Sequence, residues 1–290
     1  MPPHVKIDPG RLWLAVAFLC CFATPGRAGE PAVPGCEVHF YLNPEKVLTA
    51  GNEPTKLVVD LLGIKARPTK LRMLFLDSKY QDLHLEHWNV RFRDIEGKKK
   101  LELTYKRRYR IQGNDIDGAV AVAAQQGFGV NESDYEVEVE WGFKAKTLSF
   151  TRKKEVEGPS GASLPQAGDA RQIAVDKLPE KLAHWVRDGW AKSVLMEAHV
   201  YGPVDGKRWT GKRDKIADEI ALEVWEIRKS SGDEKERLVE VSFKNKHCSQ
   251  AKEGRDRLSE LLRDQNGWLL EDDVLKTELI LERYAPKQNQ

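Results

Sequence analysis

The pattern of hydrophobic and polar residues along the chain predicts strands in two groups. Apolar residues occupy every second position in six segments of the first half and three of the second, as in strands with one buried face. The predicted strands cover 37–42, 70–76, 88–93, 100–110, 135–143, 147–154, 219–228, 238–244 and 275–284. Helical spacing predicts helices over 54–62, 177–199 and 249–264, the last with Ser249 as its N-cap. The mixture indicates an α+β protein.

Residues 156–172 separate the two groups of strands. This segment is rich in glycine, proline, serine and alanine, which is typical of loops. We expect a flexible loop over 156–172. The basic residues of 207–215 are expected to form a solvated loop, with a binding patch as the alternative.

The first 28 residues have the pattern of a secretory signal peptide. An apolar run over 12–23 follows Lys6 and Arg11, and the small residues Gly26 and Ala28 mark a cleavage position. The run is short for a membrane span, although a retained anchor is the alternative. We expect removal of 1–28, secretion of the protein and no membrane span thereafter.

Composition describes a folded protein with little net charge. The 290 residues include 47 Lys and Arg, 45 Asp and Glu, and 40% hydrophobic residues. Removal of residues 1–28 would take away three basic residues and one acidic residue, which leaves equal numbers of both signs. This balance gives no sign of a basic tail, and we predict no specific nucleic-acid partner.

Of the four cysteines, two lie in the predicted signal peptide. The remaining pair, Cys36 and Cys248, is too small a set for a thiolate zinc site. A disulfide is the simplest use for two cysteines in an exported protein, and two buried free thiols are the alternative. Asn131 begins a glycosylation sequon whose use the sequence leaves open.

The polar faces of the predicted strands carry charges of both signs. Lys106 and Arg108 share one face of their strand, glutamates occupy positions 136, 138 and 140, and Glu219 and Glu223 share one face of theirs. The solvated side of an open antiparallel sheet would give the same alternation. If the strands close into a barrel instead, the charges line its lumen, which would suit a metal-bound polyanion.

Five short segments, in this order, resemble motifs of the CYTH-type triphosphate tunnel family. They are 75–78, 88–93, 103–106, 239–244 and 275–277. The resemblance covers 36–285 as a single domain, with tails over 29–35 and 286–290. It implies a closed antiparallel β-tunnel of about eight strands with helices packed outside. It also implies a triphosphate-type ligand, often with Mg²⁺ or Mn²⁺, and in many members hydrolysis of that ligand.

The resemblance assigns phosphate binding to cations on the strands. Guanidinium groups offer forked donors to phosphate oxygens and ammonium groups offer a compact charge. The candidates are Arg91, Arg93, Lys106, Arg108, Arg152, Lys244 and Lys276, with Lys276 on the last predicted strand. The choice between Arg152 and Lys153 stays open, because Leu148 and Phe150 share the face of Arg152.

The sequence departs from the family at the metal ligands. The family's first strand carries Glu-x-Glu-x-Lys, whereas this chain has Glu37, His39 and Tyr41, and its late Glu-x-Glu becomes Glu240-x-Ser242. Two oxygen ligands are therefore missing, and Mg²⁺ prefers six oxygens. The metal candidates are Glu37, His39 and Glu240, although a histidine here is more simply a hydrogen-bonding lumen residue.

Two main hypotheses follow for function. The first is a metal-dependent phosphohydrolase in which Glu240 holds the metal and Glu223 positions water. The second is a non-catalytic secreted protein that binds polyanions and has a degenerate metal site. A purely structural or interaction role is a third possibility. Trp88 and Trp225 are expected to pack in the core, with stacking on a base as the alternative.

Overall fold

The computed structural model describes residues 30–130, 134–158 and 163–285. Its strands are β1 Gly35–Leu42, β2 Thr69–Asp77, β3 Trp88–Ile95, β4 Leu101–Arg110, β5 Glu136–Trp141, β6 Lys146–Val156, β7 His199–Arg213, β8 Ala217–Arg228, β9 Lys235–Asn245 and β10 Leu269–Leu270. Its helices are α1 Pro44–Val47, α2 Lys56–Leu62, α3 Asp82–Leu85, α4 Ile116–Gln125, α5 Ala167–Asp176, α6 Glu180–Ala183, α7 Trp190–Met196, α8 Cys248–Arg263 and α9 Lys276–Arg283. The predicted signal peptide and Asn131 lie outside the described residues. None of the helices within these ranges is long and apolar enough to cross a membrane.

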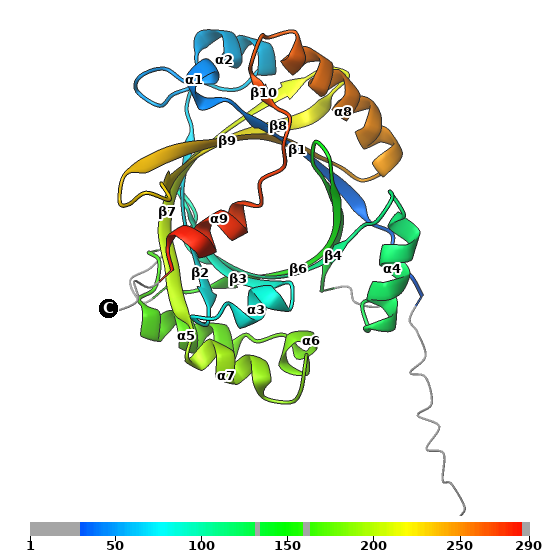
Figure 1. The fold of residues 1–290 in the computed structure, drawn as a ribbon, viewed down its shortest axis with the longest axis vertical. Helices are drawn as coiled ribbons and strands as arrows, with labels where there is room; N and C mark the ends of the chain where they lie inside the picture. Colours follow the sequence, from blue (N-terminus) through cyan, green and yellow to red (C-terminus); the bar gives the residue numbers. More distant parts are fainter. Residues whose placement is uncertain (1–29, 131–133, 159–162, 286–290) are drawn as a thin grey trace, which may run out of the picture.

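Nine strands form a closed ring, which Figure 1 shows in a view through its middle. The order is β1-β5-β6-β4-β3-β2-β7-β8-β9, and β9 pairs again with β1. The short β10 pairs with the end of β1 that β5 leaves free, at Tyr41 and Leu42. The predicted closed α+β barrel with helices outside is therefore confirmed.

The prediction of a wholly antiparallel barrel of about eight strands is wrong in detail. Strands β1 and β5 run parallel, with Gly35 opposite Glu138 and Val38 opposite Trp141. The reason is topological, because an odd number of strands cannot alternate in direction all the way round a closed ring. Every other neighbouring pair in the ring is antiparallel.

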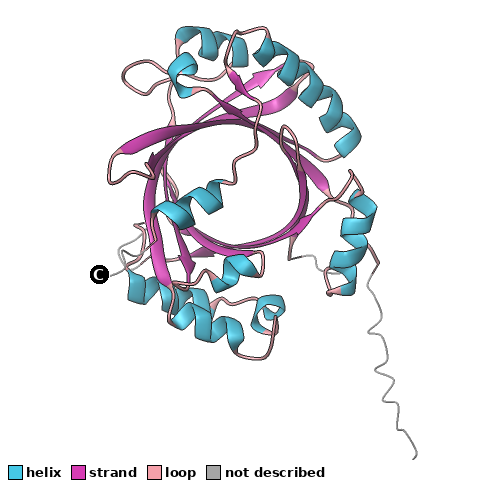
Figure 2. Cartoon of the chain, in the orientation of Figure 1, coloured by secondary structure: helices cyan, strands magenta, loops and turns pink. Residues whose placement is uncertain are grey.

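The larger hydrophobic core lies between the ring and its outer helices. Figure 2 shows all described helices except α9 outside the ring. Trp88, Phe128 and Phe150 are buried in this core, and Phe128 contacts both other rings. Apolar side chains on the outward face of each strand therefore pack beneath helices, which leaves the inward face for other side chains.

A second, smaller core lies inside the ring. It joins inward residues of β2, β7 and β8 to α9: Leu71, Met73, Phe75, Tyr201, Val204, Trp225, Ile227, Ile280, Leu281 and Tyr284. We call this set the inner apolar core. In the view of Figure 1, α9 lies across the ring. Trp225 belongs here and Trp88 to the outer core, so both tryptophans pack as expected.

The predicted last strand, 275–284, is wrong because this segment forms α9. The buried residues of this segment are 277, 280, 281 and 284. Their spacing fits one face of a helix and also fits part of a strand alternation, so periodicity cannot distinguish helix from strand in such a short segment. Thr277, Ile280 and Leu281 are buried on the helix. Lys276 therefore comes from the first turn of a helix and not from a strand.

Strand β7 replaces the loop expected over 207–215, and the pattern did not reveal it. Its glycines and the Gly202–Pro203 pair interrupt the alternation. The glycines are required by packing, since a Cβ at Gly206 would collide with the ring of Trp225 and one at Gly211 with the backbone of Gly63. Tertiary contacts thus explain residues that read locally as strand breakers.

The predicted helices are confirmed only in part. Helix α2 lies within 54–62, and Thr55 accepts a hydrogen bond from the Val58 amide at its start. The helix expected over 177–199 is two short ones, α6 and α7, with Gly189 at positive φ between them. Ser249 is not an N-cap, because α8 begins one residue earlier. Within the expected loop 156–172, α5 begins at Ala167.

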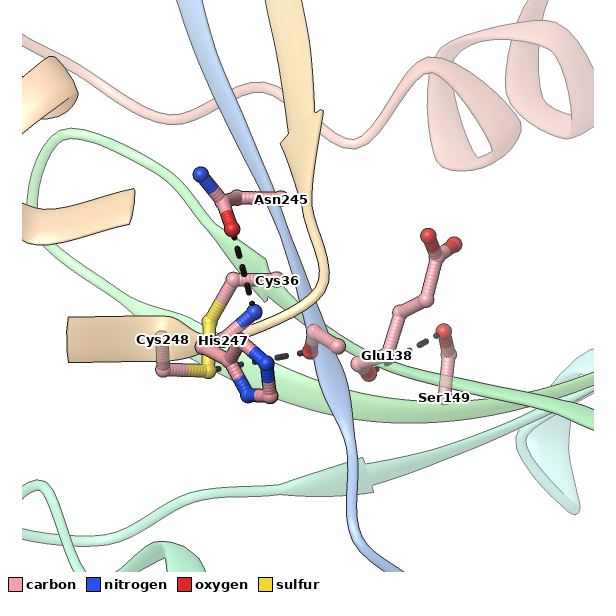
Figure 3. Close-up of a disulfide and its surroundings, with 7 residues drawn as sticks. Cys36, Glu138, Ser149, Asn245, His247 and Cys248 are labelled. Atoms are coloured by element: carbon pink, nitrogen blue, oxygen red, sulfur yellow. Dashed lines mark hydrogen bonds between the residues drawn. A yellow bond between two sulfur atoms is a disulfide. The ribbon is translucent and has the colours of Figure 1, made fainter. Parts of the chain in front are cut away.

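The predicted pairing of Cys36 with Cys248 is confirmed. This disulfide joins β1 to the first residue of α8, with the two Cα atoms 5.1 Å apart. Figure 3 shows the bridge beside β5, with the carboxylate of Glu138 pointing away from it. A cross-link between residues 212 positions apart restricts the unfolded chain and fixes the β1 side of the barrel.

Candidate functional site

The inward faces of the strands enclose a charged cavity of about 370 Å³. Alternation places every second residue of a strand in the lumen, so β4 contributes Lys106 and Arg108 while β3 contributes Arg91 and Arg93. The cationic lining residues are Arg91, Arg93, Lys106, Arg108, Lys153, Arg208, Lys244 and Lys276, and the acidic ones are Glu37, Glu102, Glu136, Glu138, Glu140, Glu219, Glu223 and Glu240. The two signs are equal in number, so local pairing decides what the cavity can bind.

Arg91, Arg93 and Arg208 all line the cavity, and we call them the arginine group. Their Nε atoms are buried and have no hydrogen-bond partner among the described residues. Arg93 makes no ion pair within the described ranges, whereas Arg91 lies 3.8 Å from Glu102 and Arg208 lies 3.3 Å from Glu219. Burial, with the nearby charge of Arg93, lowers the pKa of Arg91 to about 10. An anion placed here would relieve that unfavourable burial.

Lys106 and Arg108 share the carboxylate of Glu140. The Lys106 ammonium contacts Glu140 Oε1, and Arg108 Nε donates to Oε2 over 2.8 Å. Burial alone would raise the pKa of Glu140, but the charges of Arg108 and Lys106 hold it well below its usual value. This glutamate is therefore ionised at neutral pH and balances part of the positive charge of the two cations.

Glu223 and Glu240 lie directly opposite each other on β8 and β9 and share Lys276. Lys276 Nζ lies 3.1 Å from Glu223 Oε2 and 3.4 Å from Glu240 Oε2. Burial would raise the pKa of Glu223, but Lys276, Arg93 and Arg208 lower it to about 2. We call Glu223, Glu240 and Lys276 the Lys276 cluster.

Lys244 lies among three glutamates, Glu37, Glu136 and Glu138, and we call these four residues the Lys244 cluster. Its Nζ lies 2.6 Å from Glu138, 3.2 Å from Glu136 and 3.9 Å from Glu37. Lys153 also binds Glu136, over 2.6 Å. Burial and the charge of Glu37 raise the pKa of Glu138. This side of the cavity therefore carries more acidic than basic groups.

The proposed metal ligands do not converge. In the β1–β9 register Glu37 is opposite Lys244, His39 opposite Ser242 and Tyr41 opposite Glu240, so Glu37 and Glu240 are four positions apart along the strands. Burial and the adjacent Glu240 raise the pKa of Tyr41, which keeps its hydroxyl neutral. The described residues include no group of three or more His, Cys, Asp or Glu placed to hold a metal ion. Glu37, His39 and Glu240 thus do not fit a preformed metal site.

Arg152 is the one candidate cation that lies outside the cavity. It belongs to the outward face of β6 and pairs with Asp134 over 2.5 Å. Its neighbour Lys153 lines the lumen instead, so the choice between these two residues falls on Lys153. All other predicted site residues line the cavity, namely Glu37, His39, Arg91, Arg93, Lys106, Arg108, Glu223, Glu240, Lys244 and Lys276.

Arg208 and Glu138 are cavity residues that sequence reasoning did not select. Arg208 lies in the segment 207–215, for which the sequence predicts a loop and therefore no inward face. In the structure it lies on β7, opposite Glu223 of β8. Glu138 was visible as one of three alternating glutamates on β5. Nothing in the local pattern distinguishes it from Glu136, since their different environments arise from Lys244 and Lys153 on other strands.

Comparison with solved structures supports the fold. A candidate adenylyl cyclase from Hippeastrum, described as having a dominant triphosphatase activity, is similar over 85% of this chain and 94% of its own, with a TM-score of 0.50 and 14% identity. A candidate adenylate cyclase from Bacillus halodurans is similar over 84% of this chain and 96% of its own, with a TM-score of 0.45 and 10% identity. The PH1012 protein of Pyrococcus horikoshii OT3 is similar over 85% of this chain and 99% of its own, with a TM-score of 0.41 and 14% identity. No family profile and no curated protein sequence matches the chain. The expected triphosphate tunnel fold is confirmed.

Proposed function

We propose that the charged cavity binds a small anion of the triphosphate type. The observation that carries the proposal is the arginine group, in which three guanidinium groups face the cavity with buried Nε atoms that lack partners among the described residues. Of the three, Arg93 has no ion pair among the described residues, and a buried cation without a counterion is costly. Phosphate oxygens match the forked donors of arginine. Lys276 also faces the cavity, where it is paired with Glu223 and Glu240.

The size and charge of the cavity support a small phosphate chain. A volume of about 370 Å³ lies at the lower end of the usual range for small-molecule sites. The acids are divided evenly between the two sides of the cavity, so we expect an anion to bind beside Arg93, which has no ion pair among the described residues. The Hippeastrum neighbour's described triphosphatase activity supports the same ligand class.

Hydrolysis of that anion is the second candidate function, and the position of Glu223 favours it. This carboxylate lies beside Lys276 and Arg208, where it can orient a water molecule next to bound phosphate. Its pKa of about 2 makes it a poor proton acceptor at neutral pH, since a general base works best when its pKa is near the working pH. We therefore put binding first, and we route no step through a metal because the metal candidates do not converge.

We also propose that the protein works outside the cytosol. The disulfide between Cys36 and Cys248 supports this, because structural disulfides are rare in reducing compartments. A fusion of residues 1–28 to a reporter would test the export signal. Retention of the reporter inside the cell would contradict the proposal.

Calorimetric titration with inorganic triphosphate tests the principal proposal. We expect saturable binding of one anion per chain, with weaker binding of orthophosphate and no comparable binding of citrate. Equal affinity for citrate and triphosphate would show that the cavity selects its ligand by charge alone and has no preference for phosphate. Release of orthophosphate from bound triphosphate, followed over time, then decides whether the cavity also hydrolyses its ligand.

A further inference from the structure

The Lys276 cluster places two glutamates opposite each other, and a lysine of the same chain lies between them. Glu223 and Glu240 face each other directly across β8 and β9, and like charges in that position destabilise a sheet. Glu223 is buried and Glu240 is partly buried, which strengthens their repulsion. A cation between them is therefore required, and Lys276 lies within 3.4 Å of both.

Helix α9 holds that cation in place. Ile280 and Leu281 anchor the helix in the inner apolar core, and the Tyr284 hydroxyl accepts a hydrogen bond from the Arg228 amide over 3.3 Å. The Lys276 ammonium also lies 4.8 Å from the centre of the Trp225 ring, which is a favourable cation–π position. The ammonium is thus fixed by contacts on several sides and is not a mobile surface charge.

The Lys244 cluster has a similar but more open arrangement on the other side of the cavity, since the Lys244 side chain is 47% exposed and that of Lys276 only 16%. Lys244 lies opposite Glu37 in the β1–β9 register and reaches Glu136 and Glu138 on β5. In each cluster a lysine ammonium occupies the space between carboxylates. A divalent cation would have to displace that ammonium or lie against it, and like charges at such short range repel strongly.

We infer that Lys276 and Lys244 are internal counter-cations, which make anion binding in this cavity independent of a divalent metal ion. The inference rests on the proposed function and specifies its ionic requirement. It also offers a reason why the acids of this chain do not form a metal site: lysines of the chain lie between them and offset part of their charge. The bound species would then be the free triphosphate anion and not its metal complex.

Titration of the full chain with inorganic triphosphate, in EDTA and then in millimolar Mg²⁺ or Mn²⁺, tests the inference directly. We expect binding in EDTA that is at least as tight as binding with the metal. Binding that occurs only with the metal would overturn the inference while leaving the proposed function intact. Failure to bind under either condition would overturn the proposed function instead, and the inference with it.

Substitution Lys276→Met tests the counter-cation role with a second measurement. It keeps the length of the side chain and leaves Glu223 and Glu240 facing each other without their cation. We expect triphosphate affinity in EDTA to fall about tenfold or more, as for loss of a charged hydrogen bond. We also expect Mn²⁺ to raise the melting temperature of this variant and not that of the wild type.

Lys212→Met is the matched control, because Lys212 is an exposed lysine of β7 that pairs with Asp218 outside the cavity. It should change neither affinity nor the response to Mn²⁺. Unchanged affinity and no Mn²⁺ response in Lys276→Met would overturn the role of Lys276. Should that variant fail to fold, the wild-type titration in EDTA still decides the inference.

Discussion

Two regions inside the same barrel hold opposite kinds of side chain. The charged cavity is lined by acidic and basic residues, many of them paired in the Lys276 and Lys244 clusters, whereas the inner apolar core packs Met73, Trp225 and Leu281 against one another. Strand β8 contributes to both, with Glu223 in one and Trp225 two positions later in the other. Inward orientation alone therefore does not determine whether a residue is charged.

The difference between the two regions follows from α9. Where Ile280 and Leu281 cover the inward face, the strands carry apolar side chains, and where α9 leaves the face open they carry charges. Buried apolar area stabilises the fold directly, but buried ion pairs contribute little net stability. The inner apolar core should therefore control stability, and the charged cavity should control binding.

The largest expected effect is on stability, from Leu281→Ala. Leu281 is buried in the inner apolar core, so its truncation leaves a cavity and should lower the free energy of unfolding by about 2–5 kcal/mol. Urea denaturation measures this. Leu57→Ala on α2 is the control, because Leu57 is 54% exposed and should cost far less. A small loss for Leu281→Ala would mean that α9 does not pack as described.

A smaller effect, confined to binding, is expected from Arg93→Ala. Arg93 has no ion pair among the described residues, so its loss removes an anion contact without leaving a carboxylate unpaired. Triphosphate affinity should fall about tenfold, while the urea midpoint stays unchanged or rises. Arg152→Ala is the matched control, since this arginine pairs with Asp134 on the outer face and should leave affinity unchanged. Equal losses in both variants would contradict the placement of the site.

A third effect is a pH dependence of stability that belongs to the charged cavity. The pKa of Glu223 is lowered to about 2 in the folded protein, below its value in the unfolded chain. Its contribution to stability is therefore present above the unfolded pKa, near 4.5, and is lost as the pH falls towards 2. Glu223→Gln should flatten this part of the curve, measured by urea denaturation between pH 5 and about pH 2. If the free energy of unfolding of Glu223→Gln falls with pH as steeply as that of the wild type, the pH dependence comes from other groups.

The sequence by itself determined the inward and outward faces of most strands. Period-two alternation is a local property, so Arg91, Arg93, Lys106 and Arg108 could be placed on a single polar face before any contact was known. The two cysteines that lie outside residues 1–28 likewise suggested one simple pairing, which the structure contains. Alternation alone also fitted an open sheet, and the closed barrel was implied by the resemblance of the ordered motifs to the triphosphate tunnel family.

Tertiary structure alone decided the rest, because the deciding contacts join residues far apart in the chain. The segment 275–284 satisfies two periodicities, and only packing against β2, β7 and β8 makes it a helix. Arg208 enters the cavity because close packing at Gly206 and Gly211 lets a glycine-rich segment become a strand. The charge balance around Lys244 and Lys276 likewise depends on neighbours from other strands and from α9, which no local pattern encodes.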